Sequence, residues 1–406
     1  MAVLKLLLIL AGIIVGIRQK FFVGYLLCLA GVATPLLFGK AAPQVLEGIW
    51  YTLTSPAFWR LFGAIVIVTI LGHLLKRMGA LDRLTSAARG LAGGKRTATI
   101  ILPAVVGMMP MPGGAVLSAP LVGEVLKEDQ KSPEFLSAVN YWFRHVMEFF
   151  WPLYPGLILA AGIVGLPLPK FSALGLVMTA AMIIIGYIYF LRGIHSRRQS
   201  TETMRSLAGI MLAIWPVFLA VFLSLVLAID IVISLAVSVL LTVILNRSSW
   251  RLFWPVVKEV VAFRLFFMVF GILLFKDMVA LSGAVAGIPA EVARLGIPPA
   301  AVIMVVAFLC GLLSGMVAAF VGLSFPILAG FLYVPNLDLG NIFLTFLCGY
   351  TGMILSPTHF CLLLTAEHFR ADLGKVYRSF LPPLLLLVFF GLILYLLGYP
   401  WGLIRP

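Results

Sequence analysis

Long apolar stretches recur along the whole chain and are separated by short polar segments. They lie near residues 2–17, 21–38, 58–75, 97–126, 138–165, 171–191, 207–228, 231–245, 262–281, 297–334, 340–365 and 380–400. A helix needs about 20 apolar residues to cross a bilayer, and its backbone groups bond within the helix. A transmembrane barrel would instead need short strands of alternating polarity. The pattern predicts an all-α polytopic membrane protein.

The composition supports this prediction, and the positions of the basic residues indicate the orientation of the chain in the membrane. Of the 406 residues, 62% are hydrophobic and 11% are charged, whereas a soluble domain carries about 25% charged residues. The net charge is +14, and four loop clusters hold many of the basic residues: Lys76, Arg77, Arg83, Arg89, Lys95 and Arg96; Arg192, Arg197, Arg198 and Arg205; Arg247, Arg251 and Lys258; Arg370, Lys375 and Arg378. Basic loops stay on the cytoplasmic side. We therefore expect a multi-pass protein of the inner (cytoplasmic) membrane. Nucleic acid is not an expected partner, because the basic residues do not interleave with aromatic ones.

One apolar stretch, residues 97–126, contains residues that a helix interior tolerates poorly. Pro112, Gly113 and Gly114 lie near its middle, and basic residues flank both of its ends. Both ends are therefore expected in the cytoplasm. This pattern predicts a re-entrant hairpin whose Pro-Gly tip reaches about mid-bilayer, at about 1.5 Å per helical residue. The alternative is a proline-kinked helix that crosses the membrane.

The chain repeats itself with an offset of about 205 residues. Ser118 in AVLSAPLV and Ser324 in VGLSFPIL differ by 206 positions (324 − 118), and Pro152 and Pro357 differ by 205 (357 − 152). The first repeat has three crossings and a hairpin, and two linking crossings follow it. The second repeat therefore begins on the opposite side of the membrane. We expect about ten transmembrane helices plus two re-entrant hairpins, arranged in two inverted repeats.

These patterns divide the chain into four parts. They are two N-terminal transmembrane helices in 1–57; a first inverted repeat in 58–200, with a hairpin at 97–126 and a broken helix at 138–165; two linking transmembrane helices in 201–250; and a second inverted repeat in 251–406, with a hairpin at 297–334 and a broken helix at 340–365. Inverted repeats with broken helices are typical of secondary transporters, whose solute site lies near the midplane where the repeats meet.

The motifs PMPGGAVLSAPLV and GYTGMILSPTHFCL resemble those of the ion transporter superfamily, which includes gluconate, citrate, dicarboxylate and arsenite carriers. The chain beyond about residue 58 is most similar to a prokaryotic membrane-protein family known only as a domain of unknown function. The resemblance implies two re-entrant hairpins and ion- or proton-coupled movement of small, mostly anionic solutes. One tip reads Pro-Gly-Gly and the other Ser-Gly-Met. The Ser-Asn-Thr motif of the dicarboxylate branch is absent, so its sodium site is not carried over.

Polar residues in the hairpins and broken helices are the candidates for binding solute and ions. They are Pro112, Gly113, Gly114, Ser118, Arg144, His145, Glu148, Ser314, Gly315, Ser324, Gly349, Thr351, Ser356, Thr358 and His359. Charges inside a membrane segment are expensive and face a cavity or each other. Arg144 and Glu148 are spaced i, i+4, so they are expected to share a helix face. They form either a structural pair or an anion site beside a cation site.

The remaining residues narrow the class of function. The four cysteines Cys28, Cys310, Cys348 and Cys361 lie in apolar segments without metal-ligand spacing, so they are read as packing residues and no metal is expected. Nucleophile-elbow, HExxH and Walker A motifs are absent. The sequence therefore favours a secondary transporter for a small anionic solute, not an enzyme, with Na⁺ or H⁺ as coupling ion and no other cofactor. An intramembrane enzyme or a channel is the alternative. The expected partners are the solute and the lipid bilayer, and a homodimer is left open.

Overall fold

The computed structural model describes residues 2–88, 94–109, 114–194, 203–261, 263–333, 336–402 and 404. Within these ranges the regular structure is helical, apart from one isolated bridge between Tyr333 and Leu337. The prediction of an all-α chain is confirmed. Two proposed site residues, Pro112 and Gly113, lie outside the described residues.

The helices follow the apolar stretches closely. In chain order they are α1 Ala2–Arg18, α2 Val23–Leu37, α3 Ala42–Thr54, α4 Pro56–Arg77, α5 Ala80–Ala88, α6 Gly94–Gly107, α7 Gly114–Val125, α8 Pro133–His145, α9 Pro155–Val164, α10 Leu168–Gly186, α11 Thr203–Ala213, α12 Trp215–Val221, α13 Ile231–Leu245, α14 Arg247–Val260, α15 Phe263–Ser282, α16 Ala284–Arg294, α17 Pro299–Ser314, α18 Val317–Leu332, α19 Leu339–Ile354, α20 Phe360–Phe369 and α21 Leu373–Leu396. A 3-10 turn, Lys127–Asp129, follows α7, and π-helical turns at Tyr187–Leu191 and Phe222–Val226 extend α10 and α12.

Among the described residues, four helices are long and apolar enough to cross a membrane alone: α4, α10 with its π turn, α15 and α21. The pair α16–α17, bent by 113°, forms a fifth candidate span. Many of the other apolar helices have only 10 to 17 residues, and several of them are consecutive. The chain is therefore a multi-pass membrane protein in which short helices must combine to cover the bilayer.

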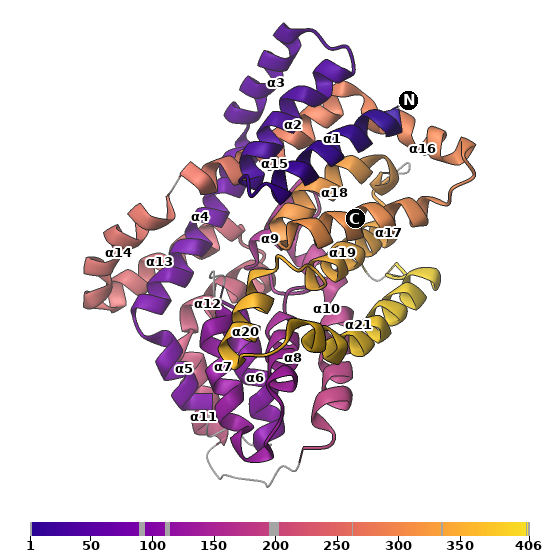
Figure 1. Ribbon diagram of the computed structural model, residues 1–406. Helices are drawn as coiled ribbons and strands as arrows, with labels where there is room; N and C mark the ends of the chain where they lie inside the picture. Colours follow the sequence, from indigo (N-terminus) through magenta and orange to yellow (C-terminus); the bar gives the residue numbers. More distant parts are fainter. Residues whose placement is uncertain are drawn as a thin grey trace.

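The N-terminal helices pack against the second half of the chain. Helix α2 lies along α15, and α1 lies on α16 (Figure 1). The backbone amides of Ala2 and Val3 donate to the Glu291 carboxylate at 2.7 and 3.0 Å. Helix α3, which the apolar pattern did not predict, is tied to α15 by a 2.8 Å hydrogen bond from Thr52 to Asp277. These helices form one edge of the molecule.

Helices α6 and α7 form a hairpin. They pack against each other, and the two ends of the stretch meet at its base. Lys95 Nζ at the start of α6 lies 2.7 Å from Glu128 Oε2 and 3.2 Å from Asp129 Oδ2, just beyond α7. The hydrogen bond from Lys95 also lowers the pKa of Glu128. These contacts hold the two ends of the stretch together.

Helices α17 and α18 form the corresponding pair in the second half. They pack against each other and are joined by Gly315 and Met316 alone. Gly315 has φ +63°, a left-handed conformation that ends a helix without the strain of a Cβ atom. The Ser-Gly-Met motif is thus a tight turn between two helices.

Two further helices are broken where proline predicted a break. Helix α8 ends at His145 and α9 begins at Pro155, so residues 146–154 are irregular. Helix α19 ends at Ile354 and α20 begins at Phe360, so residues 355–359 are irregular. Pro152 and Pro357 lie inside these breaks, where they remove backbone donors that a continuous helix would need.

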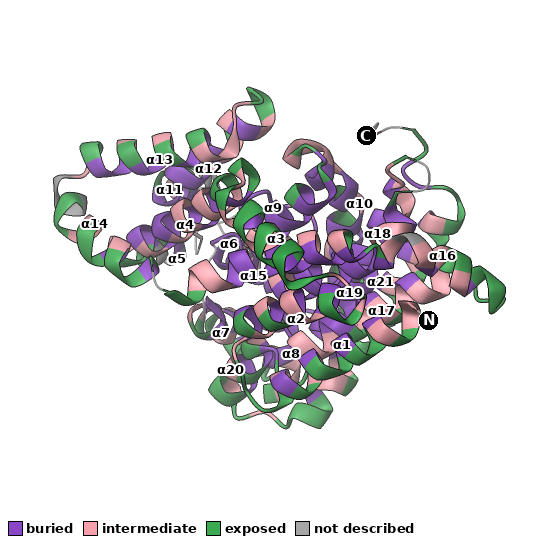
Figure 2. Ribbon diagram, turned by 90° about the horizontal axis from the view of Figure 1, so that it is seen from above, coloured by how far each residue is buried: buried purple, intermediate pink, exposed green. Residues whose placement is uncertain are grey.

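The most deeply buried part of the molecule surrounds these breaks. Figure 2 shows buried residues gathered on the central helices and exposed ones on outer helices such as α13 and α14. Large side chains with almost no exposure include Tyr141, Trp142 and Phe143 on α8, Phe320 on α18 and Tyr350 on α19. Such a surrounding excludes both lipid and water, which is where irregular backbone is tolerated at membrane depth.

Candidate solute- and ion-binding site

Two tyrosines join the broken helices to each other. Tyr141 on α8 donates its hydroxyl to the Ile354 carbonyl at the end of α19, at 2.9 Å. Tyr350 on α19 donates to the His145 carbonyl at the end of α8, also at 2.9 Å. Carbonyls at a helix C-terminus lack intrahelical partners. In each broken helix, therefore, a tyrosine from the other broken helix donates a hydrogen bond to a carbonyl at the helix end.

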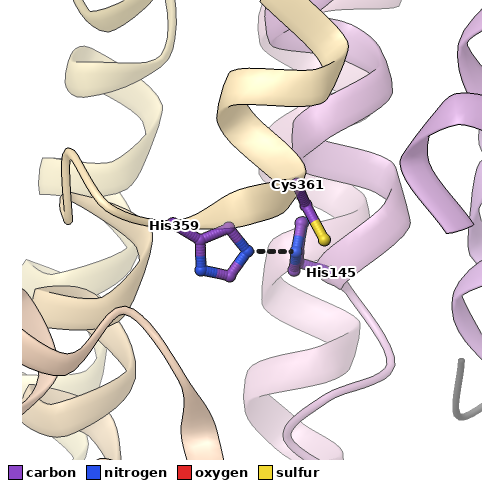
Figure 3. A group of neighbouring side chains, drawn as sticks. All are labelled: His145, His359 and Cys361. Carbon is purple, nitrogen blue, oxygen red and sulfur yellow. Dashed lines mark hydrogen bonds between the residues drawn. The ribbon is translucent and has the colours of Figure 1, made fainter. Parts of the chain in front are cut away.

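Two histidines meet between the breaks. His145 Nε2 lies 3.1 Å from His359 Nε2, and His145 Nδ1 lies 2.6 Å from the Tyr141 carbonyl. Because a carbonyl accepts only, Nδ1 of His145 carries a proton. In the neutral ring Nε2 of His145 is then the acceptor, and His359 donates to it. Figure 3 shows the two rings. The two histidines are 214 positions apart in the sequence, one in each half of the chain.

The charged residues of the first break lie beside this histidine pair. Glu148 Oε1 is 3.9 Å from His145 Nε2, and Glu148 Oε2 has no hydrogen-bond partner among the described residues. The first alternative for Arg144 and Glu148, a structural ion pair, is not formed, because α8 ends at His145 and Glu148 is no longer one helical turn beyond Arg144. Arg144 is 4% exposed, and within the described part of the chain its Nε also has no partner.

The α6–α7 hairpin reaches the first break. A Cβ atom at Gly114 would lie 2.6 Å from Arg144 Nη2, and one at Gly107 would strike the Arg144 carbonyl. The Tyr154 hydroxyl, just before α9, donates to the Gly107 carbonyl. The described ends of this hairpin therefore lie against Arg144 and the start of α9, and Gly114 leaves room for the guanidinium.

The α17–α18 hairpin reaches the second break in the same way. A Cβ atom at Gly315 would lie 2.9 Å from Thr358 Oγ1, 3.0 Å from Ser356 Oγ and 3.1 Å from the His359 amide. The two hydroxyls are themselves 2.9 Å apart. A Cβ at Gly156, at the start of α9, would meet Val317 at the start of α18. The amino ends of α9, α18 and α20 therefore lie near one another.

A known protein family matches almost the whole chain. The model of a family described as "Protein of unknown function (DUF401)" matches residues 2–397. The chain belongs to this family. The predicted likeness to a family of unknown function is thereby confirmed. Among curated proteins, none matches the chain significantly.

A solved structure has a similar fold. The crystal structure of the Alcanivorax borkumensis YdaH transporter, described as having an unusual topology, is 14% identical to this DUF401 chain. The match covers 89% of each chain with a TM-score of 0.51. The fold is therefore shared over most of the chain.

Several predicted site residues of the DUF401 chain have partners within their own helices. Each of the following hydroxyls donates to a carbonyl three or four residues earlier: Ser118 to Ala115 at 3.4 Å, Ser314 to Cys310 at 2.7 Å, Ser324 to Phe320 at 2.7 Å and Thr351 to Leu347 at 2.7 Å. Gly349 allows close packing against the Phe320 ring. These residues position the helices, whereas Gly114, Arg144, His145, Glu148, Gly315, Ser356, Thr358 and His359 are brought together around the breaks.

Other residues at the breaks were not among the predicted set. They are Asn140, Tyr141, Tyr154 and Cys361. Asn140 on α8 donates to Thr365 on α20 at 3.0 Å, and its buried Oδ1 has no partner among the residues that the structure describes. The repeat offset could have identified Tyr154, since it precedes α9 as His359 precedes α20 and the two differ by 205 (359 − 154). Without that offset, a single tyrosine in an apolar stretch does not indicate a functional role.

Proposed function

We propose that this DUF401 protein is a secondary active transporter that moves a small, carboxylate-type anion across the inner membrane by alternating access, coupled to protons or sodium. The observation that carries the proposal is Arg144. It is buried at the meeting point of a hairpin and a broken helix, and among the described residues no carboxylate lies at ion-pair distance from it. A buried charge without a partner is costly, and a bound anion would supply that partner.

The helix ends around the breaks support an anionic solute. The amino ends of α9, α18 and α20 lie close together, and α7 begins at Gly114 beside Arg144. Helix amino ends carry partial positive charge and unbonded amides, which favour an anion. The guanidinium adds paired donors that match a carboxylate. Ser356 and Thr358 add hydroxyls on the opposite side of the site.

Glu148 supports coupling to a cation. An anion carrier needs to offset the charge that it moves, and Glu148 is a buried acid with one oxygen unpartnered among the described residues. In this proposal Arg144 contacts the solute, and Glu148 takes the coupling proton or sodium ion. The two roles then belong to residues four positions apart (148 − 144), one before and one after the end of α8.

The finer topology belongs to the same proposal: two inverted repeats, about ten crossings and two re-entrant hairpins, α6–α7 and α17–α18. The helices of the first hairpin have 14 and 12 residues. At about 1.5 Å per residue these measure roughly 21 and 18 Å, less than the roughly 30 Å hydrocarbon core. The contact of Lys95 with Glu128 at the hairpin base supports entry and exit on one side.

Accessibility labelling tests the topology. In a cysteine-free background, Glu128→Cys should react with a membrane-impermeant maleimide only from the cytoplasm, and Pro167→Cys only from outside. Both positions are exposed. Labelling of the residue 128 variant from outside would make 97–126 a crossing and would remove the inverted symmetry.

Transport itself is tested in two steps. A thermal-shift panel of small carboxylates, with and without sodium and across pH, identifies a binding anion, because a ligand of the folded state raises its stability. Uptake of that anion into proteoliposomes should be saturable and should depend on a sodium or proton gradient. Flux that never saturates would indicate a channel, and chemical conversion without uptake would indicate an enzyme. Either result contradicts the proposal.

A further inference from the structure

We propose that His145, His359 and Cys361 form a binding site for a d-block metal ion that prefers nitrogen and sulfur ligands, with Zn²⁺ as the reference ion. His145 Nε2 or Nδ1, His359 Nε2 or Nδ1 and Cys361 Sγ offer atoms that all lie within 4.8 Å of one another. Figure 3 shows the two rings facing each other with the Cys361 sulfur beside His145. The sequence did not indicate this site, because its ligands come from both halves of the chain.

The distances suit a tetrahedral ion. Zinc binds imidazole nitrogen at about 2.0–2.1 Å and thiolate sulfur at about 2.3 Å, so neighbouring ligand atoms lie roughly 3.3–3.7 Å apart. The two Nε2 atoms are 3.1 Å apart, and the sulfur lies within 4.8 Å of the ligand atoms. Side-chain shifts of about 1 Å would close the set around an ion.

The tautomer of His145 is already the one that a metal needs. Its Nδ1 donates to the Tyr141 carbonyl at 2.6 Å, which leaves a lone pair on Nε2 directed at His359. Histidine ligands of metals characteristically make such a bond with the ring nitrogen that does not bind the metal, because it fixes the orientation of the ring. On binding, the proton of His359 moves from Nε2 to Nδ1, so both imidazoles stay neutral.

The charges around the site select the type of ion. Cys361 binds as a thiolate and releases one proton for each metal ion bound. The Glu148 carboxylate lies 3.9 Å from His145 Nε2 but is not one of the three clustered ligands. The Cys361 thiolate offsets part of the charge of a dication, whereas sulfur and imidazole are poor ligands for Na⁺, Mg²⁺ or Ca²⁺.

The test uses the purified, tag-free, full-length protein in detergent after removal of metals. Calorimetric titration with Zn²⁺ should give one site, with one proton released per ion when buffers of different ionisation enthalpy are compared. Titration with Co²⁺ should give the charge-transfer absorption of a cobalt–thiolate bond. Cys361→Ser should abolish that absorption, and Cys361→Ser and His359→Ala should each weaken Zn²⁺ binding at least about tenfold. Cys310→Ser is the matched control, since Cys310 is fully buried on α17 away from the cluster.

If a variant fails to fold, the Co²⁺ absorption spectrum of the wild-type protein still tests the proposal. A Co²⁺ complex without the thiolate band, or no binding of either ion to the wild-type protein, overturns the proposal. Unchanged Zn²⁺ affinity in folded Cys361→Ser and His359→Ala proteins does so as well. None of these outcomes bears on anion transport, which is measured separately.

Discussion

The two broken helices, α8–α9 and α19–α20, have the same construction but different chemistry. Their second halves begin 205 residues apart (360 − 155), and a hairpin lies against each break. The first break is longer and adjoins Arg144, His145 and Glu148, whereas the second holds Ser356, Thr358 and His359. The two breaks therefore differ in chemistry. The first has the charged residues, and the second has the neutral hydroxyl groups.

The largest expected effect concerns the first hairpin. Gly114→Val places a branched side chain where Arg144 Nη2 lies 2.6 Å from a Cβ atom, so the guanidinium is displaced. Uptake in proteoliposomes should be lost while the detergent-purified protein remains folded. Gly12→Val is the control, because no atom lies within 4 Å of a Cβ atom there. Full uptake by the Gly114 variant would show that the hairpin end does not approach the site during transport.

The next prediction compares how much anion affinity is lost when the Arg144 charge is removed and when the Thr358 hydroxyl is removed. Truncating one partner of a buried charged contact costs about 2–5 kcal/mol, and losing a neutral hydrogen bond about 1 kcal/mol. Arg144→Gln should therefore weaken affinity for the transported carboxylate at least about 30-fold, and Thr358→Val about fivefold. Thermal-shift titration and the KM of uptake measure both. Equal effects would mean that the two breaks contribute alike.

Glu148→Gln should separate coupling from solute binding. The amide keeps the shape of the side chain but does not carry a negative charge, so it cannot hold the coupling cation. The dependence of uptake on the proton or sodium gradient should fall more than affinity for the anion, the reverse of Arg144→Gln. If Glu148→Gln instead abolishes binding of a cationic solute while Arg144→Gln leaves anion affinity unchanged, the assignment of charges is wrong.

The smallest expected effect falls on stability. Tyr350→Phe and Tyr141→Phe each remove one hydrogen bond between the broken helices, worth about 0.5–1.5 kcal/mol. Both should lower the thermal midpoint by a few degrees. Tyr25→Phe, on an outer helix, should leave the midpoint unchanged. A midpoint as high as that of the wild-type protein in both buried variants would show that these bonds do not hold the repeats together.

The sequence predicted the elements of the fold better than their contacts. Proline and glycine act locally on the backbone, so the breaks near Pro152 and Pro357 and the turn at Gly315 were predicted in place. Helices α3, α5, α14 and α16 were missed, because they are short or amphipathic and do not appear as long apolar runs.

The candidate site was predicted only in part for a related reason. Arg144 and Glu148 were expected to share one face of a continuous helix, as a structural pair or as separate binding groups, but the helix ends between them. The contact of His145 with His359 joins positions 214 apart, and no local pattern specifies such a partner. Cys361 was read as a packing residue for the same reason, although its position as the second residue of α20 places it beside His145.

The charged residues of the first break lie in the first half of the chain, so they are synthesised before the residues that surround them. Arg144 and Glu148 are made first, but Tyr350 and His359, which enclose them, follow 205 and 214 residues after His145. At about 5–20 residues per second, that interval lasts roughly 10–40 s. During this time the ribosome is still adding the second repeat, and the charged end of α8 has no finished enclosure. Lipid accommodates such groups poorly, so the nascent first repeat depends on a polar environment, such as the insertion machinery, until its other half arrives.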